Sequence, residues 1–162
     1  MQNKKYLATI ILPAVFKKGT ILNPGLIESI LGQFSDGTSI EDVPYNNRYI
    51  FSIRDHLSRL FNTRKGSISH LPEYGLPDIS TIYSRMPQGV RVLQNSIKMT
   101  IQKYEYRMKN ITVTPIESDN PFKLIFLISG QLKSGNTAKF RTVFTTSGNS
   151  FVTPCKALDN YD

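Results

Sequence analysis

The chain has 162 residues, 40% of them hydrophobic, which is the size and apolar content of one folded domain and excludes wholesale disorder. Twenty Lys and Arg against twelve Asp and Glu give a net charge of +8, which suits nucleic acid, anionic lipid or an acidic protein without choosing between them. The single cysteine, Cys155, excludes an internal disulfide.

Residues 1–22 form the expected N-terminal segment, with an apolar run from Leu7 to Phe16. Pro13 interrupts this run, which is much shorter than the about 20 residues that span a bilayer. Lys17 and Lys18 follow the run directly, and no small-residue cleavage site comes after them, which disfavours a signal peptide. We therefore expect this segment to pack on a partner or on the domain.

Apolar residues at three- and four-residue spacing predict three helices. The first begins at residues 23–24, where Asn is a good N-cap and Pro a good first residue, and it ends at residues 35–37. The second runs from about residue 47 to residue 62, with Gly66 as its stop signal. The third runs from residue 87 to residue 106, after a long proline-containing connection over residues 67–87.

Beyond the third helix the apolar period changes to two, which predicts strands. The expected strands are residues 110–115, 124–128 and 139–146, and turn residues separate them at 118–121 and 134–136. The continuous apolar run at 124–128 is typical of a central strand. N-terminal helices followed by a small antiparallel β-meander define an α+β fold. We expect the domain to cover residues 23–146 and residues 147–162 to be a loose C-terminal tail.

Catalytic and metal-binding patterns are weak. His56, His70 and Cys155 do not form a metal-ligand pattern, and the sequence has no phosphate-binding glycine loop. Asp55 and Glu73 could be nominated as the two carboxylates of a glycosidase, but Asp55 has arginines beside it and one turn on, which would keep it ionised. We therefore expect a helix-surface ion pair at Asp55, and no enzyme, cofactor or metal.

The middle of the chain is basic and could meet phosphates through Arg54, Arg59, Arg64 and Lys65. No nucleic-acid-binding motif accompanies these residues, and a charge cluster is more often a solvated face or a protein contact. A nucleic-acid-binding module therefore stays an alternative rather than the expected function.

One stretch carries a more specific signal. Residues 52–67 read SIRDHLSRLFNTRKGS, and residues 70–78 read HLPEYGLPD. This stretch resembles the signature of the phage gene-25-like baseplate family and of its bacterial branch, the TssE family of type VI secretion systems. In that signature an arginine-bearing helix closes in Leu-Leu-Asn-Thr-Arg-x-Gly-Ser, and Pro-x-x-Gly-x-Pro-Asp follows after a short gap. Residues 60–67 match with one conservative change and residues 74–78 match closely.

The chain differs from the family signature at one motif. The family carries Glu-Pro-Arg where the last helix meets the first strand, and this chain has Glu105-Tyr106-Arg107. Without the proline the sequence does not fix the end of the helix. Because charged side chains are rarely buried unless they are paired, we expect Glu105 and Arg107 not to be fully buried without a partner.

The resemblance implies a structural baseplate component with a fold similar to the assembly domain of contractile-sheath subunits. It further implies the wedge proteins TssF, TssG and TssK and the sheath proteins TssB and TssC as partners, with no small-molecule substrate, nucleic acid or membrane insertion, in a cytoplasmic, membrane-docked baseplate. A lysozyme-like peptidoglycan hydrolase is the enzymatic alternative. The candidate partner-binding residues are Arg59, Asn62, Arg64, Gly66, Glu105, Arg107, Lys139 and Arg141.

Two further expectations concern the loop and the sheet. Arg64 and Asp78 could pin the loop to its own domain, a role compatible with partner binding. The resemblance also implies that the sheet accepts an extra strand from a sheath protein. Residues 110–115 and 139–146 are the candidate edges, and we favour the second, because Lys139 and Arg141 would discourage promiscuous pairing there.

Overall fold

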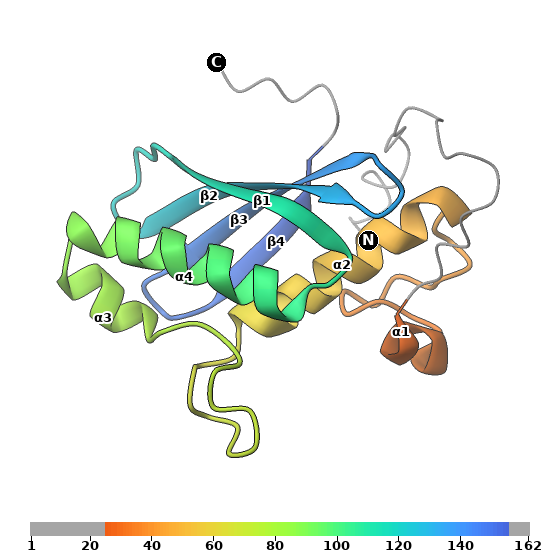
Figure 1. Ribbon diagram of the computed structural model, residues 1–162, viewed down its shortest axis with the longest axis horizontal. Coiled ribbons are helices and arrows are strands. Elements are labelled where there is room, and N and C mark those ends of the chain that lie inside the picture. Colours follow the sequence, from red (N-terminus) through yellow and green to blue (C-terminus); the bar gives the residue numbers. More distant parts are fainter. Residues whose placement is uncertain (1–24, 156–162) are drawn as a thin grey trace, which may run out of the picture.

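The computed structural model describes residues 25–155, which form helices packed on one face of a four-stranded sheet (Figure 1). The helices are α1 (Leu26–Leu31), α2 (Tyr45–Phe61), α3 (Ile79–Ser84) and α4 (Gln88–Tyr104). The strands are β1 (Met108–Ile116), β2 (Lys123–Leu132), β3 (Thr137–Thr145) and β4 (Ser150–Pro154). This arrangement confirms the α+β class.

The two long helices form where the apolar period is strongest. On α2, the side chains of Ile53, Leu57 and Leu60 are completely buried. Leu93, Ile97 and Ile101 repeat every four residues along α4 and are also completely buried. Both stripes face one cluster that includes the inward-facing sheet residues, with α2 packed on β4 and α4 packed on β1.

The short helices differ from the sequence expectation. Helix α1 ends earlier than expected, at Gly32, which adopts a left-handed conformation with φ of 70°. Phe34, expected in that helix, lies beyond it in a small separate cluster with Val43 and Phe51. Helix α3 lies in the connection expected to be a loop, and Asp78 caps it by accepting a hydrogen bond from the Ser80 N–H.

The sheet is an antiparallel meander in the order β1-β2-β3-β4, so it has four strands rather than the expected three. Residues 150–154, assigned to a loose tail, form β4 and pair with β3 from Phe144↔Ser150 to Phe140↔Pro154. The prediction that residues 139–146 form the docking edge is therefore wrong, because β3 has strands on both sides. The edges are β1 and β4. Residues 1–24 and 156–162 lie outside the described part of the chain, and with them the expected N-terminal segment and the expected helix start at residues 23–24.

Candidate functional site: a buried ionic network and two sheet edges

Helix α1 is attached to the body of the protein through an acidic residue. The Glu28 side chain is 2% exposed and accepts a hydrogen bond from Arg59 Nη2 at 2.9 Å. The Ser52 hydroxyl also donates to Glu28, and it accepts the backbone N–H of Gly25 at 2.8 Å. The large apolar residues of α1 are instead exposed: Leu26, Ile27, Ile30 and Leu31. This is the reverse of an ordinary surface helix.

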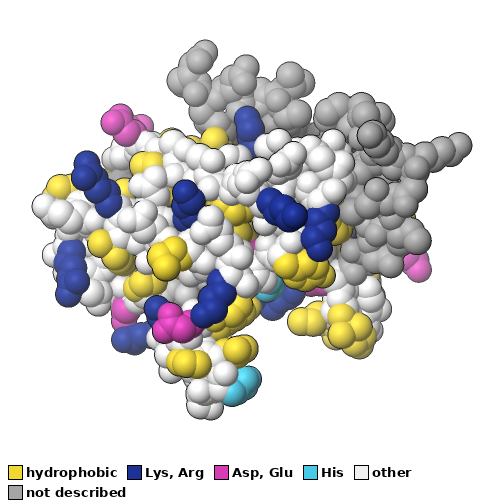
Figure 2. Space-filling model, viewed as in Figure 1, with side chains coloured by type: hydrophobic (Ala, Val, Ile, Leu, Met, Phe, Trp, Pro, Cys, Tyr) yellow, Lys and Arg dark blue, Asp and Glu magenta, His cyan; other side chains and the backbone are white. Residues whose placement is uncertain are grey.

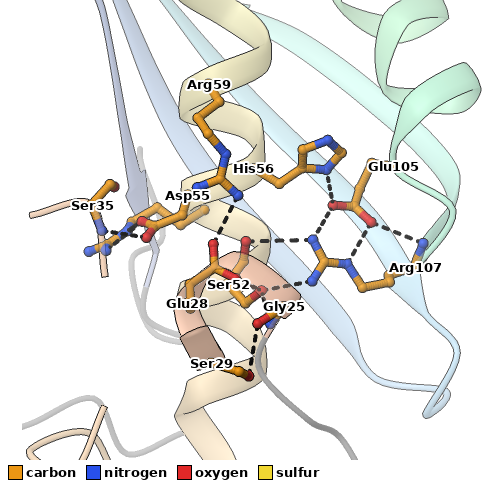
Figure 3. Close-up of polar contacts among 11 residues, drawn as sticks. Gly25, Glu28, Ser29, Ser35, Ser52, Asp55, His56, Arg59, Glu105 and Arg107 are labelled. Carbon is orange, nitrogen blue, oxygen red and sulfur yellow. Dashed lines mark hydrogen bonds and ion pairs between the residues drawn. The ribbon is translucent and has the colours of Figure 1, made fainter. Parts of the chain in front are cut away.

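Glu105 and Arg107 form the centre of the same network (Figure 3). Arg107 Nε and Nη2 donate to the two oxygens of Glu105 at 2.8 and 2.6 Å, and the Arg107 backbone N–H adds a third bond. His56 Nδ1 lies 2.8 Å from Glu105 Oε2, and Arg107 Nη1 donates to Ser52 Oγ at 2.9 Å. The network therefore runs from the α4–β1 junction through α2 to α1.

The expectation that Glu105 and Arg107 need a partner to be buried is wrong. Glu105 is 0% exposed and Arg107 9% exposed within this chain alone. Each neutralises the other, and His56 and Ser52 take up their remaining hydrogen-bonding groups. Burial raises the pKa of Glu105, but hydrogen bonds from Arg107 and His56 outweigh it and lower the pKa to about 2. An ionised, fully occupied carboxylate is unsuited to general acid catalysis.

Asp55 is also buried rather than part of a surface ion pair. Its carboxylate is completely inaccessible and accepts hydrogen bonds from Arg54 Nη2 and from the Ser35 N–H, both at 2.6 Å. Arg54 also pairs with Asp36 at 2.7 Å, whereas Arg59, the other expected neighbour, turns to Glu28. Asp55 therefore ties the segment after α1 to α2, and no substrate can reach it.

The loop after α2 is fastened to its own domain. Arg64 Nη2 lies 3.0 Å from Asp78 Oδ2, as expected for a pinned loop, although Arg64 is 71% exposed. Hydrogen bonds from Ser80 hold the pKa of Asp78 below its usual value, against the effect of burial, and Arg64 adds to them. Gly66 has φ of 86°, which favours glycine at this turn.

Asn62 connects this region to the sheet. Its side-chain amide donates to the Ser150 carbonyl at 3.1 Å and accepts the Ser150 N–H at 2.8 Å. Because Ser150 is the first residue of β4, the amide occupies the first position on the outer edge of that strand in the way a neighbouring strand would. Lys139 and Arg141, on β3, lie on the sheet face away from the helices, exposed and half-buried respectively.

The two edges differ in the backbone groups they leave open. In an antiparallel ladder, alternate residues direct their N–H and C=O groups outward. On β1 the outward positions include Val113, whose carbonyl accepts from Gln94 Nε2 at 2.6 Å, and Pro115, which has no N–H. On β4 they are Ser150, Val152 and Pro154. Among these described edge positions, Val152 has both a backbone N–H and a backbone C=O, and no side chain bonds to either.

The described residues contain no group of three or more His, Cys, Asp or Glu side chains that could hold a metal ion. Within that part of the chain, none of the helices is long and apolar enough to cross a membrane.

Comparison with known proteins identifies the family. A sequence profile of the family described as baseplate wedge protein gp25 matches residues 48–137, more than half of the chain. The chain belongs to the baseplate wedge protein gp25 family. It therefore has a structural role in a baseplate.

A solved structure supports the same family fold. A chain in "The baseplate complex from the type VI secretion system" is 29% identical to this chain, with a TM-score of 0.51. The match covers 60% of this chain and 94% of the other. A comparison with curated proteins gives no significant match.

The family match includes most of α2, the loop and the Glu105–Arg107 junction, whereas α1 and β4 lie outside it. Sequence reasoning missed three members of the network: Glu28, Ser52 and His56. A signal for Glu28 exists, since it is the single charged residue among the apolar residues of α1. Ser52 and His56 are four residues apart and so share one side of α2, a pattern that indicates a common neighbour but does not identify it.

Proposed function

We propose that this chain is a baseplate subunit of a type VI secretion system, which binds the wedge complex and docks the first sheath ring by strand addition. The wedge partners would be TssF, TssG and TssK, and the sheath partners TssB and TssC. This role involves no covalent chemistry. It implies a place in the cytoplasm, in a baseplate docked to the membrane.

The observation that carries the proposal is the open backbone of Val152 on β4. Strand addition needs an outward N–H and C=O on a sheet edge. Val152 offers both, whereas on β1 Gln94 takes the Val113 carbonyl and Pro115 removes a donor. Phe151, next to Val152, is 60% exposed and could pack on a side chain of the added strand. We therefore assign sheath docking to β4.

For wedge binding, the proposal rests on the exposed apolar face of α1. Leu26 is 77% and Ile30 74% exposed, which is unfavourable for an isolated protein and favourable for a protein contact. Glu28, Arg59 and Ser52 hold α1 in a fixed orientation. Glu105 and Arg107 would then act on the wedge indirectly, because Arg107 positions Ser52.

The test is a proline at Val152. Pro115 and Pro154 already occupy outward-facing edge positions, so Val152→Pro should remove one outward donor and leave the fold intact. We expect the variant to co-purify with TssF and TssG but to start no sheath when the baseplate is mixed with TssB and TssC. Val152→Thr, which keeps the N–H and a similar shape, is the matched control and should start sheaths normally. Normal sheath growth with folded Val152→Pro would remove β4 as the docking edge.

A further inference from the structure

The outer face of α4 carries a regular pattern that neither the fold nor the proposed function uses. Val92 and Met99, seven residues apart, are 45% and 70% exposed, and Tyr106, a further seven along, is 72% exposed. A seven-residue spacing returns a side chain to nearly the same side of a helix. Val92 and Met99 therefore lie in one line along the outside of α4, and Tyr106 follows the residue that caps the helix, Glu105.

The side chains around this line are polar amides and cations. Gln88, Asn95 and Gln102 are exposed and repeat with the same spacing of seven. Arg91 and Lys98, also seven apart and exposed, follow beside them, and Lys103 lies one turn beyond Met99. Figure 2 shows this face, with dark-blue cationic side chains distributed around yellow apolar ones.

The charged side chains of α4 itself have one sign. Helix α4 contains no Asp or Glu, whereas solvated helix faces usually mix both signs. Beyond the helix, Lys133 Nζ lies 4.6 Å from the centre of the Tyr106 ring, which adds a further cation at that end. In the adjoining loop, the acidic side chain of Glu73 is paired with Lys65 at 2.7 Å.

A hollow adjoins the apolar line at Met99. It has a volume of 170 Å³ and lies between α4 and the loop after α2, with Met99, Thr100 and Lys103 on one side and Gly75 and Pro77 on the other. The ion pair of Lys65 with Glu73 also lines its loop side. A hollow of this size beside an exposed methionine can receive a side chain from a bound partner.

We propose that the outer face of α4 binds an acidic amphipathic helix of another protein. The apolar line would pack against the partner's apolar stripe, and Arg91, Lys98 and Lys103 would face its carboxylates. Gln88 to Gln102 span about 21 Å at 1.5 Å per residue, so the partner helix has about four turns. A nucleic acid fits less well, because the side chains of Val92 and Met99 have no group that binds a phosphate. The proposal holds whether or not the sheath docks at β4.

A photo-cross-linking amino acid at Met99, in the full chain expressed in its native host, tests this surface. We expect a cross-link to one protein segment with a helical apolar repeat and more Asp and Glu than Lys and Arg. The double change Arg91→Glu with Lys98→Glu should reduce the cross-link by about tenfold, because like charges then face each other. The control Lys109→Glu with Lys123→Glu, on exposed sheet positions with the same change in net charge, should leave the cross-link unchanged.

Each other result overturns the proposal. Cross-links to nucleic acid, to a second copy of this chain or to a segment without acidic residues would assign the face to a different partner. An absence of cross-links in cells with assembled sheaths would show that the face stays in solvent. Thermal unfolding of the purified variants separates loss of binding from loss of folding. A result at Met99 is also independent of the result of Val152→Pro.

Discussion

At the scale of single residues, the charged junction Glu105-Tyr106-Arg107 shows how burial changes the meaning of a motif. Its two charged side chains are inside the protein and bond to each other, whereas Tyr106 between them is 72% exposed. The buried pair connects the end of α4 to Ser52 on α2. Changing either charge therefore affects the fold first and a partner second.

Replacing Glu105 with Gln tests this view of the network. The Arg107 guanidinium would then be buried without a negative charge, so we expect the free energy of unfolding to fall by about 3–5 kcal/mol. Urea unfolding measures the change. Glu73→Gln is the control, because Glu73 lies at the surface in an exposed pair with Lys65 and should leave the midpoint unchanged. Equal midpoints for both variants would show that the buried network does not stabilise the fold.

The same variant has a defined pH dependence. The pKa of Glu105 is lowered from 4.5 to about 2, so its ionised form stabilises the folded state above about pH 4.5. That stabilisation is lost as the pH falls towards 2, where the folded protein also binds the proton. The difference in unfolding free energy between the parent and Glu105→Gln should therefore shrink between about pH 5 and pH 2. A difference that stays constant over this range would assign the stabilisation to packing rather than to charge.

At the scale of elements, the loop between α2 and α3 depends on two glycines in different ways. Both have positive φ, 86° at Gly66 and 100° at Gly75. A Cβ at Gly66 would meet nothing within 4 Å, whereas a Cβ at Gly75 would collide with the backbone of Thr63. The Leu76 N–H donates to the Thr63 carbonyl, and the Lys65 N–H donates to the Leu76 carbonyl. These two hydrogen bonds explain why the two segments of the loop lie so close.

Alanine at each glycine separates conformational strain from close approach. Gly66→Ala should cost about 1 kcal/mol, the cost of a left-handed alanine. Gly75→Ala should cost at least about 2 kcal/mol more, because the backbone of Thr63 must also move. Chemical denaturation of both variants gives the comparison. Similar costs would mean that the loop yields easily at Thr63.

The sequence predicts α2 and α4 because their buried residues repeat at helical spacing over about five turns. It predicts the first and third strands from their alternation and the second from its continuous apolar run. Helix α3 is too short for a period to show and lies among prolines. Strand β4 is missed because five residues with Ser, Thr and Pro give no alternation that stands out from a tail. The sequence also cannot show that Glu105 meets His56, 49 residues away, so its burial was not predictable.

At the scale of the whole molecule, α2 joins the two regions that we propose for assembly. Ser52 and Arg59 on α2 hold α1, and Asn62 directly after α2 holds the start of β4. Ser52 and Asn62 are ten residues apart, or about 15 Å along the helix. A wedge contact at α1 and a sheath contact at β4 would therefore both be held by α2. The position of the wedge would then fix the position of the docking strand without a conformational change.

Substitutions on α1 should separate the two contacts. Leu26→Ser with Ile30→Ser removes two exposed apolar side chains and leaves Glu28 and its bonds in place, so folding should be unaffected. If the wedge covers this face, the lost burial of about 3–6 kcal/mol should reduce co-purification with TssF and TssG at least tenfold. Leu71→Ser, at another exposed apolar residue, is the control. Wedge binding that survives the double substitution would place the contact elsewhere, and the open groups of Val152 would still be free to receive a strand.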